Sequence, residues 1–278
     1  MRADRRDALS LLAALALVAT CGSVLLAGIG GGGVAPPDGF ITGCRISFSG
    51  DNTVLVAPGV VRDADDITTI TVASTITLTT ADQAYSAGTG GGLDTGVTRA
   101  ANTWYYAHLA NSSTVGILLS TSRTAPTLPA GVTNTRWIGA CRADAAADWL
   151  QCDSYGDAAR MMNYVREDPN VAPLRVLNNG SATAFTNLDV SAVVPPEADD
   201  VWLWIHSGAS GWMLVTSAGF PGVNHERVVN WDANATTADA HGIMISVSRL
   251  QSFKYRMFAG STGHVNVQGY SISCDGTE

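Results

Sequence analysis

After residue 40, apolar and polar residues alternate along much of the chain, which is the pattern of pleated strands. The clearest example covers residues 102–142. Within it, the alternation predicts strands at 104–109, 115–120 and 136–141. We therefore expect an antiparallel β unit to be built around this stretch.

The segments between these three strands contain residues that stop regular structure. Asn111, Ser112 and Ser113 supply turn chemistry after the first strand. Pro126 and Pro129 lie before the third strand and exclude a helix there. The pattern therefore predicts strand, turn, strand, proline-rich crossing and strand.

Short β-branched and aromatic runs bounded by Gly, Pro, Asn or Asp predict further strands on both sides of this stretch. In the first part of the chain they are residues 45–48, 53–57, 67–72, 76–78, 149–155 and 159–165. In the second part they are residues 174–177, 183–188, 201–207, 212–217, 227–232, 242–247, 254–258 and 265–273. The Gly-rich residues 86–96 are expected to form a flexible loop.

These patterns predict a mainly β fold with one or two antiparallel β-sandwich bodies that are jelly-roll-like. A polar stretch that ends in Pro169 suggests a boundary, so we expect bodies at residues 34–166 and 167–278. Residues 1–33 are expected to form an N-terminal apolar α-helix followed by a Gly-rich linker.

The apolar N-terminal segment has three interpretations. Residues 8–29 contain no charged residue and follow an Arg-rich start. Three copies could pack as a bundle that anchors the protein in an assembly, because small residues allow close helix packing. The segment also fits a membrane contact or span, or a signal peptide with Cys21 in a loose lipobox. The possible anchor residues are Leu9, Leu12, Ala16, Ala19 and Leu25.

The composition restricts the partners. Only 14% of the residues are charged, the net charge is -8, and Lys254 is the single lysine. Nucleic-acid binding is not expected, because it needs Lys and Arg to neutralise phosphates. A surface with so little charge suggests association with other copies or other proteins.

The sequence predicts no metal site and no cofactor. Five cysteines without a CxxC pair argue against tetrahedral zinc. Cys141 and Cys152 could form a disulfide across adjacent strands, but buried free thiols are favoured. Asp63, Asp65 and Asp66 lack the EF-hand spacing and are expected to form a solvated turn.

No enzymatic activity is predicted. The chain lacks a GxSxG elbow, and its Gly-rich loop lacks the GxxxxGK[ST] pattern of a phosphate-binding loop. A pair of carboxylates for glycan cleavage remains open, because their separation is spatial and leaves no local pattern.

Four tryptophans are candidate recognition residues. Trp202 and Trp204 are two positions apart and should share one face of a strand. Exposed aromatic side chains commonly hold saccharides and protein partners, although core packing is the more common fate. The candidates are Trp202, Trp204, Trp212 and Trp231.

Residues 102–142 contain the runs NTWYY, LLSTS, PTLPAG and RWIGA in this order. This series resembles a β module of tailed-phage virion proteins found in tail fibres, head fibres and other minor structural proteins. The resemblance covers residues 44–155. It implies a virion structural protein that assembles in the host cytoplasm, forms a homotrimer and contacts other tail or capsid proteins. It also implies contact with a host surface glycan or envelope protein.

Two other classes remain open. One is a membrane-anchored or lipidated bacterial surface protein that carries the β body outside. The other is a glycan-degrading enzyme with unassigned carboxylates.

Overall fold

The computed structural model describes residues 36–79, 81–165, 168–207, 213–218, 227–229, 240–247, 250–258 and 260–274. The chain divides into two units, Met1–Pro36 and Pro37–Glu278. The expected N-terminal helix and all five possible anchor residues lie outside the described residues. In the part of the chain that is described, no helix is long and apolar enough to cross a membrane.

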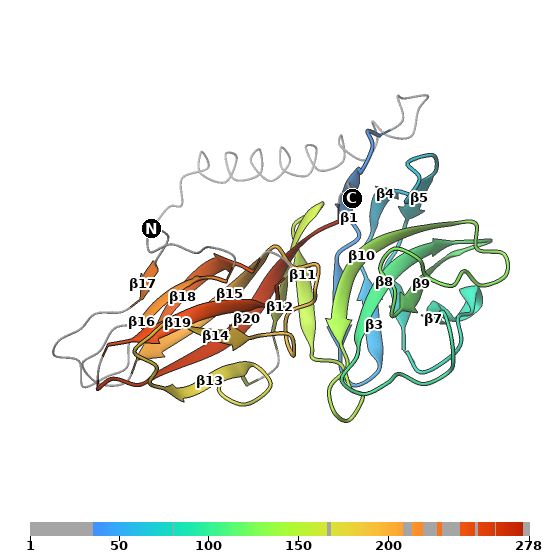
Figure 1. The fold of residues 1–278 in the computed structure, drawn as a ribbon. Helices are drawn as coiled ribbons and strands as arrows, with labels where there is room; N and C mark the ends of the chain where they lie inside the picture. Colours follow the sequence, from blue (N-terminus) through green and yellow to red (C-terminus); the bar gives the residue numbers. More distant parts are fainter. Residues whose placement is uncertain are drawn as a thin grey trace, which may run out of the picture. The chain divides into compact units, whose positions relative to one another are not determined.

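The regular secondary structure in the described part of Pro37–Glu278 is almost entirely strand, which confirms the mainly β prediction (Figure 1). Up to residue 165 these are β1 Ile41–Gly43, β2 Ile46–Ser49, β3 Thr53–Val56, β4 Gly59–Arg62, β5 Thr69–Val72, β6 Ile76–Leu78, β7 Gly91–Leu93, β8 Trp104–Asn111, β9 Val115–Ser120, β10 Asn134–Arg142, β11 Cys152–Tyr155 and β12 Ala159–Tyr164, with a 3-10 helix, η1, at Ala87–Thr89. They are followed by β13 Arg175–Gly180, β14 Thr186–Asp189, β15 Asp200–Ser207, β16 Met213–Ser217, β17 Arg227–Val229, β18 Ala240–Ser246, β19 Ser252–Met257 and β20 Gly263–Ser273.

These strands form four sheets. Their orders are β1-β4-β5, β10-β8-β9-β7, β14-β19-β16-β17 and β18-β15-β20-β12-β11-β2-β3-β6, with β13 also paired to β20. The pairs are antiparallel except β7 with β9. Strands from both sides of residue 166 therefore belong to one sheet, since β12 pairs with both β11 and β20.

The predicted strands of residues 102–142 are confirmed nearly to the residue. β8 and β9 form a hairpin whose last pair is Asn111 with Val115, and β10 lies on the other side of β8. The connection before β10 contains neither helix nor strand, as its prolines predicted. The alternation along β8 does not mark an exposed face, however. Tyr105 packs against Trp149 and Tyr106 against Trp137, so both faces of the strand are covered.

The prediction of a flexible loop at residues 86–96 is wrong. This segment contains η1 and β7, and β7 pairs in parallel with β9. A β-carbon on Gly91 would lie 1.9 Å from the carbonyl oxygen of Ile117, so this strand can approach its neighbour only because it has glycine there.

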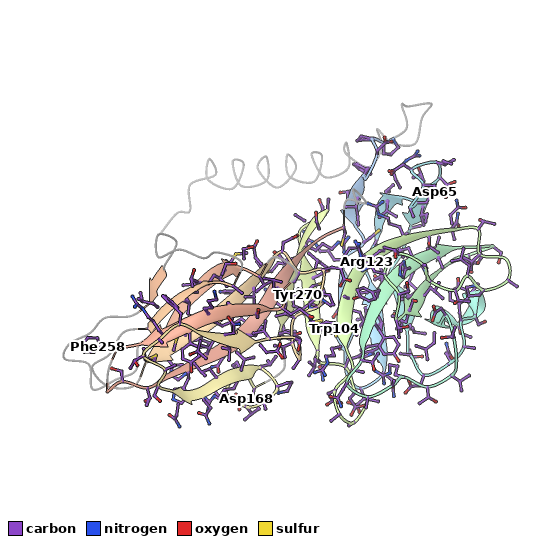
Figure 2. All side chains as sticks on the ribbon, viewed as in Figure 1. Asp65, Trp104, Arg123, Asp168, Phe258 and Tyr270 are labelled. Atoms are coloured by element: carbon purple, nitrogen blue, oxygen red, sulfur yellow. The ribbon has the colours of Figure 1, made fainter. Side chains whose placement is uncertain are left out.

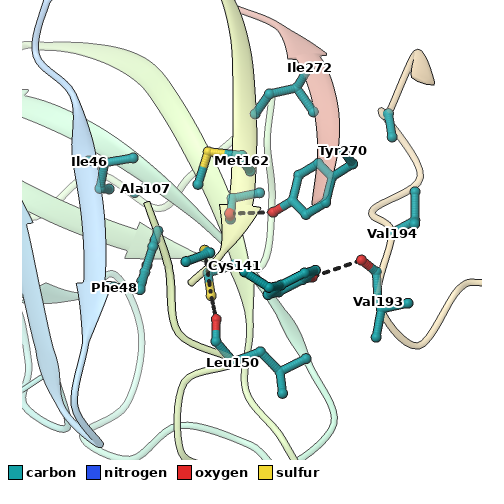
Figure 3. Packing of buried hydrophobic residues seen from close by; sticks show 14 of the residues in the cluster. Ile46, Phe48, Ala107, Cys141, Leu150, Met162, Val193, Val194, Tyr270 and Ile272 are labelled. Atoms are coloured by element: carbon teal, nitrogen blue, oxygen red, sulfur yellow. Dashed lines mark hydrogen bonds between the residues drawn. The ribbon is translucent and has the colours of Figure 1, made fainter. Parts of the chain in front are cut away.

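Side chains from β8, β10 and β12 donate hydrogen bonds to a segment between β14 and β15. Trp104 Nε1, Arg142 Nη1 and Tyr164 Oη donate to the consecutive carbonyls of residues 191, 192 and 193, at 3.2, 2.6 and 2.7 Å. In addition, Tyr270 Oη of β20 donates a hydrogen bond to the carbonyl of Ala140 on β10 at 2.7 Å (Figure 3). These hydrogen bonds, two of them buried, join parts of the chain that the sequence suggested to be separate bodies.

The described cysteines are buried, and none of them forms a disulfide with another described residue. The Sγ atoms of Cys141 and Cys152 lie 3.4 Å apart, and Cys141 also contacts the carbonyl of Leu150 (Figure 3). Burial raises the pKa of the Cys44 thiol to about 12, and nearby Arg160 only partly opposes this. The interpretation of these residues as small buried hydrophobic groups is confirmed.

Candidate recognition surfaces

The outer face of β15 carries two of the predicted tryptophans. Val201, Leu203 and Ile205 of this strand are fully buried, so the alternating residues Trp202 and Trp204 share the opposite face. Trp204 is 41% exposed, whereas Trp202 is half-buried. The prediction of a common face is confirmed. Trp212 and Trp231 lie outside the described residues, so their role stays a prediction.

Strand pairing defines the neighbours of these tryptophans. Trp202 lies opposite Met244 of β18, which is 40% exposed, and Trp204 lies opposite Gly242. A β-carbon on Gly242 would lie 3.1 Å from Nε1 of Trp202, so the Trp202 indole reaches over this glycine. We call Trp202, Trp204, His206, Met244 and His264 the aromatic face.

A pair of histidines forms one end of the aromatic face. His206 of β15 lies directly opposite His264 of β20, and their rings stack with centroids 4.7 Å apart. Partial burial lowers the pKa of both imidazoles, and the nearby guanidinium of Arg175 lowers it further. Both rings are therefore neutral at neutral pH. The aromatic face thus presents uncharged, flat side chains on paired strands, which suits contact with a sugar ring or an apolar partner surface.

A second candidate site is a concave region beside residues 63–66. One cavity of about 310 Å³ and a neighbouring one of about 200 Å³ share Ala64, Asp65, Thr124, Pro126 and Thr135 in their walls. We call this combined depression the groove. One wall is the turn between β4 and β5, and the other is the proline-rich connection after β9 (Figure 2 labels Asp65 and Arg123).

Buried polar residues hold the walls of the groove. Asp63 is 1% exposed, and its carboxylate accepts hydrogen bonds from the backbone N–H groups of Ile67 and Thr68 and from Asn134 Nδ2. Burial alone would raise the pKa of Asp63, but these hydrogen bonds outweigh it and lower the pKa. The expectation of a solvated turn is therefore wrong for Asp63, while Asp65 is exposed.

Arg136 crosses beneath the groove from β10. Its guanidinium donates to the backbone carbonyls of Gly39, Asp63 and Cys274, and the side chain is 3% exposed. One residue thus fixes three chain segments that are distant in sequence. This arrangement ties the Asp63 wall of the groove to the segments that contain Gly39 and Cys274.

His108 and Arg123 complete the lining. The His108 ring nitrogen Nε2 lies 3.2 Å from the carbonyl oxygen of Ser122, and the side chain is 2% exposed. Burial lowers the pKa of His108 to about 4, so the ring is neutral and Nε2 carries the proton that it donates. The guanidinium of Arg123 lies 5.1 Å from the centre of the Trp137 ring.

The sequence does not predict the groove. It predicts a turn at the Asp cluster and a proline-rich crossing before β10, but no local pattern shows that these two segments face each other. Their juxtaposition follows from the hydrogen bond between the backbone of Ala64 and Thr135 on β10.

No protein-family model matches the chain, and no curated protein matches it either. Among the described residues, no group of three or more His, Cys, Asp or Glu side chains is placed to hold a metal ion.

Proposed function

We propose that the chain is a structural, non-enzymatic protein of a tailed-phage virion. In this proposal it is a homotrimeric component of a tail tip, tail fibre or head fibre. Residues 1–33 attach it to other tail or capsid proteins through an apolar helix, and jelly-roll-like β-sandwich bodies project from the anchor. The proposal is supported by the resemblance of residues 102–142, which lie in the hydrogen-bonded centre of the β unit.

The proposed task of the β unit is contact with the host surface through the aromatic face. The observation that carries this part is the 41% exposure of Trp204 on a strand that is paired on both sides. Together with Trp202 and the exposed Met244, this indole forms an apolar patch of the kind that marks interaction sites. Because the strands are fixed by pairing, binding would cost little conformational entropy.

The virion role is tested by locating the protein. Particles of the phage that carries this sequence would be purified on a density gradient and analysed by mass spectrometry and immunogold labelling. We expect peptides of this chain in the particles and label at one position on the tail or head. Detection only in host membranes, with Cys21 acylated, would overturn the proposal in favour of a lipidated surface protein.

The contact role is tested with a matched pair of variants. Trp204→Ala removes the exposed indole, and Tyr155→Ala removes a comparably exposed aromatic ring, 47% exposed, from β11. We expect Trp204→Ala to weaken binding of the purified protein to host cells by about tenfold, since exposed tryptophans often dominate recognition. Equal binding by the wild type and Trp204→Ala would exclude the aromatic face as the contact.

A further inference from the structure

The groove contains a hydrogen-bond acceptor that no donor among the described residues engages. His108 lines the larger cavity, and its Nε2 donates to the carbonyl of Ser122. Within the described residues, the other ring nitrogen, Nδ1, has no hydrogen-bond partner. In the neutral ring this atom carries a lone pair and can accept a hydrogen bond from a ligand.

A second acceptor lies on the opposite wall. The exposed carboxylate of Asp65 lines both parts of the groove, and within the described residues its oxygens accept no hydrogen bond. The hydroxyl groups of Thr124 and Thr135 lie along the same walls and can donate or accept. A ligand that uses both acceptors therefore donates at least two hydrogen bonds.

The charged groups around the groove have both signs, so they give a ligand with a strong net charge no advantage. A cation would meet Arg123 and Arg136, which both line the larger cavity. An anion would meet Asp65 and, in the smaller cavity, the ionised Asp63. In a partly closed site such like-charge contacts are costly. A neutral ligand rich in hydroxyl groups avoids both and supplies the required donors.

The size of the groove restricts the ligand further. The larger cavity of about 310 Å³ is at the lower end of the range of about 300–1,000 Å³ for small-molecule sites. We infer that the groove binds an uncharged, polyhydroxylated ligand of one or two sugar rings, with hydroxyl groups donating to Asp65 and to Nδ1 of His108. This site is separate from the aromatic face and does not depend on the virion role.

The first experiment is saturation-transfer NMR on the full chain with three methyl glycosides. One is a neutral hexose, one is the corresponding uronic acid and one is the corresponding amino sugar. We expect the neutral glycoside to bind with a dissociation constant of about 1 mM, as is usual for a ligand with few contacts. The two charged glycosides should bind at least about fivefold more weakly. Tighter binding of either charged form, or no binding of the neutral form, would overturn the inference.

Matched variants assign the binding to the groove. Asp65→Ala and Thr124→Val should each weaken binding of the neutral glycoside by about fivefold, the effect of one lost hydrogen bond. Asp51→Ala removes an exposed aspartate outside the groove and should leave binding unchanged. If Trp204→Ala abolishes binding while Asp65→Ala does not, the sugar binds to the aromatic face and the groove assignment is wrong.

Discussion

The aromatic face and the groove are held in place by different kinds of interaction. Residues of the aromatic face project from β15, β18 and β20, whose backbone pairing fixes their positions. The groove is formed by two connections that have no ladder between them. Asp63, His108 and Arg136 fix these connections through hydrogen bonds to backbone groups.

This difference extends to the two parts of the described chain. Up to residue 165 the buried polar side chains include six ionisable residues: Arg62, Asp63, Arg99, His108, Arg136 and Arg160. After residue 168 the buried polar side chains among the described residues are uncharged: Thr216, Ser217, Ser261 and Asn266. The groove, which is built from connections, thus depends on buried ionisable residues. Substitutions that weaken ligand binding to the groove should therefore also lower the stability of the protein. A site built on paired strands should tolerate substitution at its surface.

The largest effect is expected for Arg136→Met. Methionine fills a similar volume but leaves the carbonyls of Gly39 and Cys274 without their donor, while the carbonyl of Asp63 keeps the N–H of Asp66. We expect the free energy of unfolding to fall by about 4 kcal/mol, because each buried unsatisfied group costs on the order of 1–3 kcal/mol. Urea unfolding monitored by tryptophan fluorescence measures this change.

Arg45→Met is the control for this substitution, because Arg45 is exposed. Its effect should stay within about 0.5 kcal/mol. A loss of less than about 1 kcal/mol in Arg136→Met would contradict the view that this guanidinium holds the groove together.

The second largest effect concerns pH and His108. The folded state protonates His108 only near pH 4, whereas the unfolded chain protonates it near 6.5. Between these values the unfolded state binds more protons, so stability is complete above pH 6.5 and falls as the pH decreases. The expected loss from this residue is up to about 3 kcal/mol at pH 4. Asp94 opposes the lowered pKa and Arg123 contributes to it.

Urea titrations at several pH values on the wild type and on His108→Gln separate this contribution from other groups. The variant should lose clearly less stability than the wild type between pH 6.5 and pH 4. His206 and His264 have pKa values lowered in the same direction, so some pH dependence should remain. Parallel curves for the two proteins would show that His108 is not the group responsible.

The sequence predicts the strand-built surface better than the groove, for physical reasons. Period-two alternation is a local property, so it places Trp202 and Trp204 on one face and locates β8, β9 and β10. β7 was missed because its glycines carry no alternating pattern and its parallel partner lies far along the chain. The groove was missed because its lining comes from segments that are far apart in the sequence, around residues 64, 108, 123–137 and 274.

A third effect tests whether both surfaces belong to one cooperative unit. Tyr106 Oη of β8 donates a 2.7 Å hydrogen bond to Glu197 Oε2, from the segment before β15. Burial is the main cause of the raised pKa of Tyr106, and the Glu197 carboxylate raises this pKa further. Tyr106→Phe should lower the free energy of unfolding by about 2 kcal/mol, the usual value for a hydrogen bond to a charged group. We expect a single transition both in thermal unfolding followed by calorimetry and in urea unfolding followed by fluorescence. Two transitions would mean that the parts unfold independently.

The smallest effect is expected on the aromatic face itself. Gly242→Ala would place a methyl group 3.1 Å from Nε1 of Trp202, so the indole must move by a few tenths of an ångström. Gly242 is exposed and the ring can shift outward, so stability should change by no more than about 0.5 kcal/mol. The indole N–H resonance of Trp202 in a ¹⁵N-correlated NMR spectrum should nevertheless move, while that of Trp137, whose N–H donates to Gly139, should not. If both resonances move, the substitution disturbs more than the surface, and the aromatic face is less independent of the groove than its strand pairing implies.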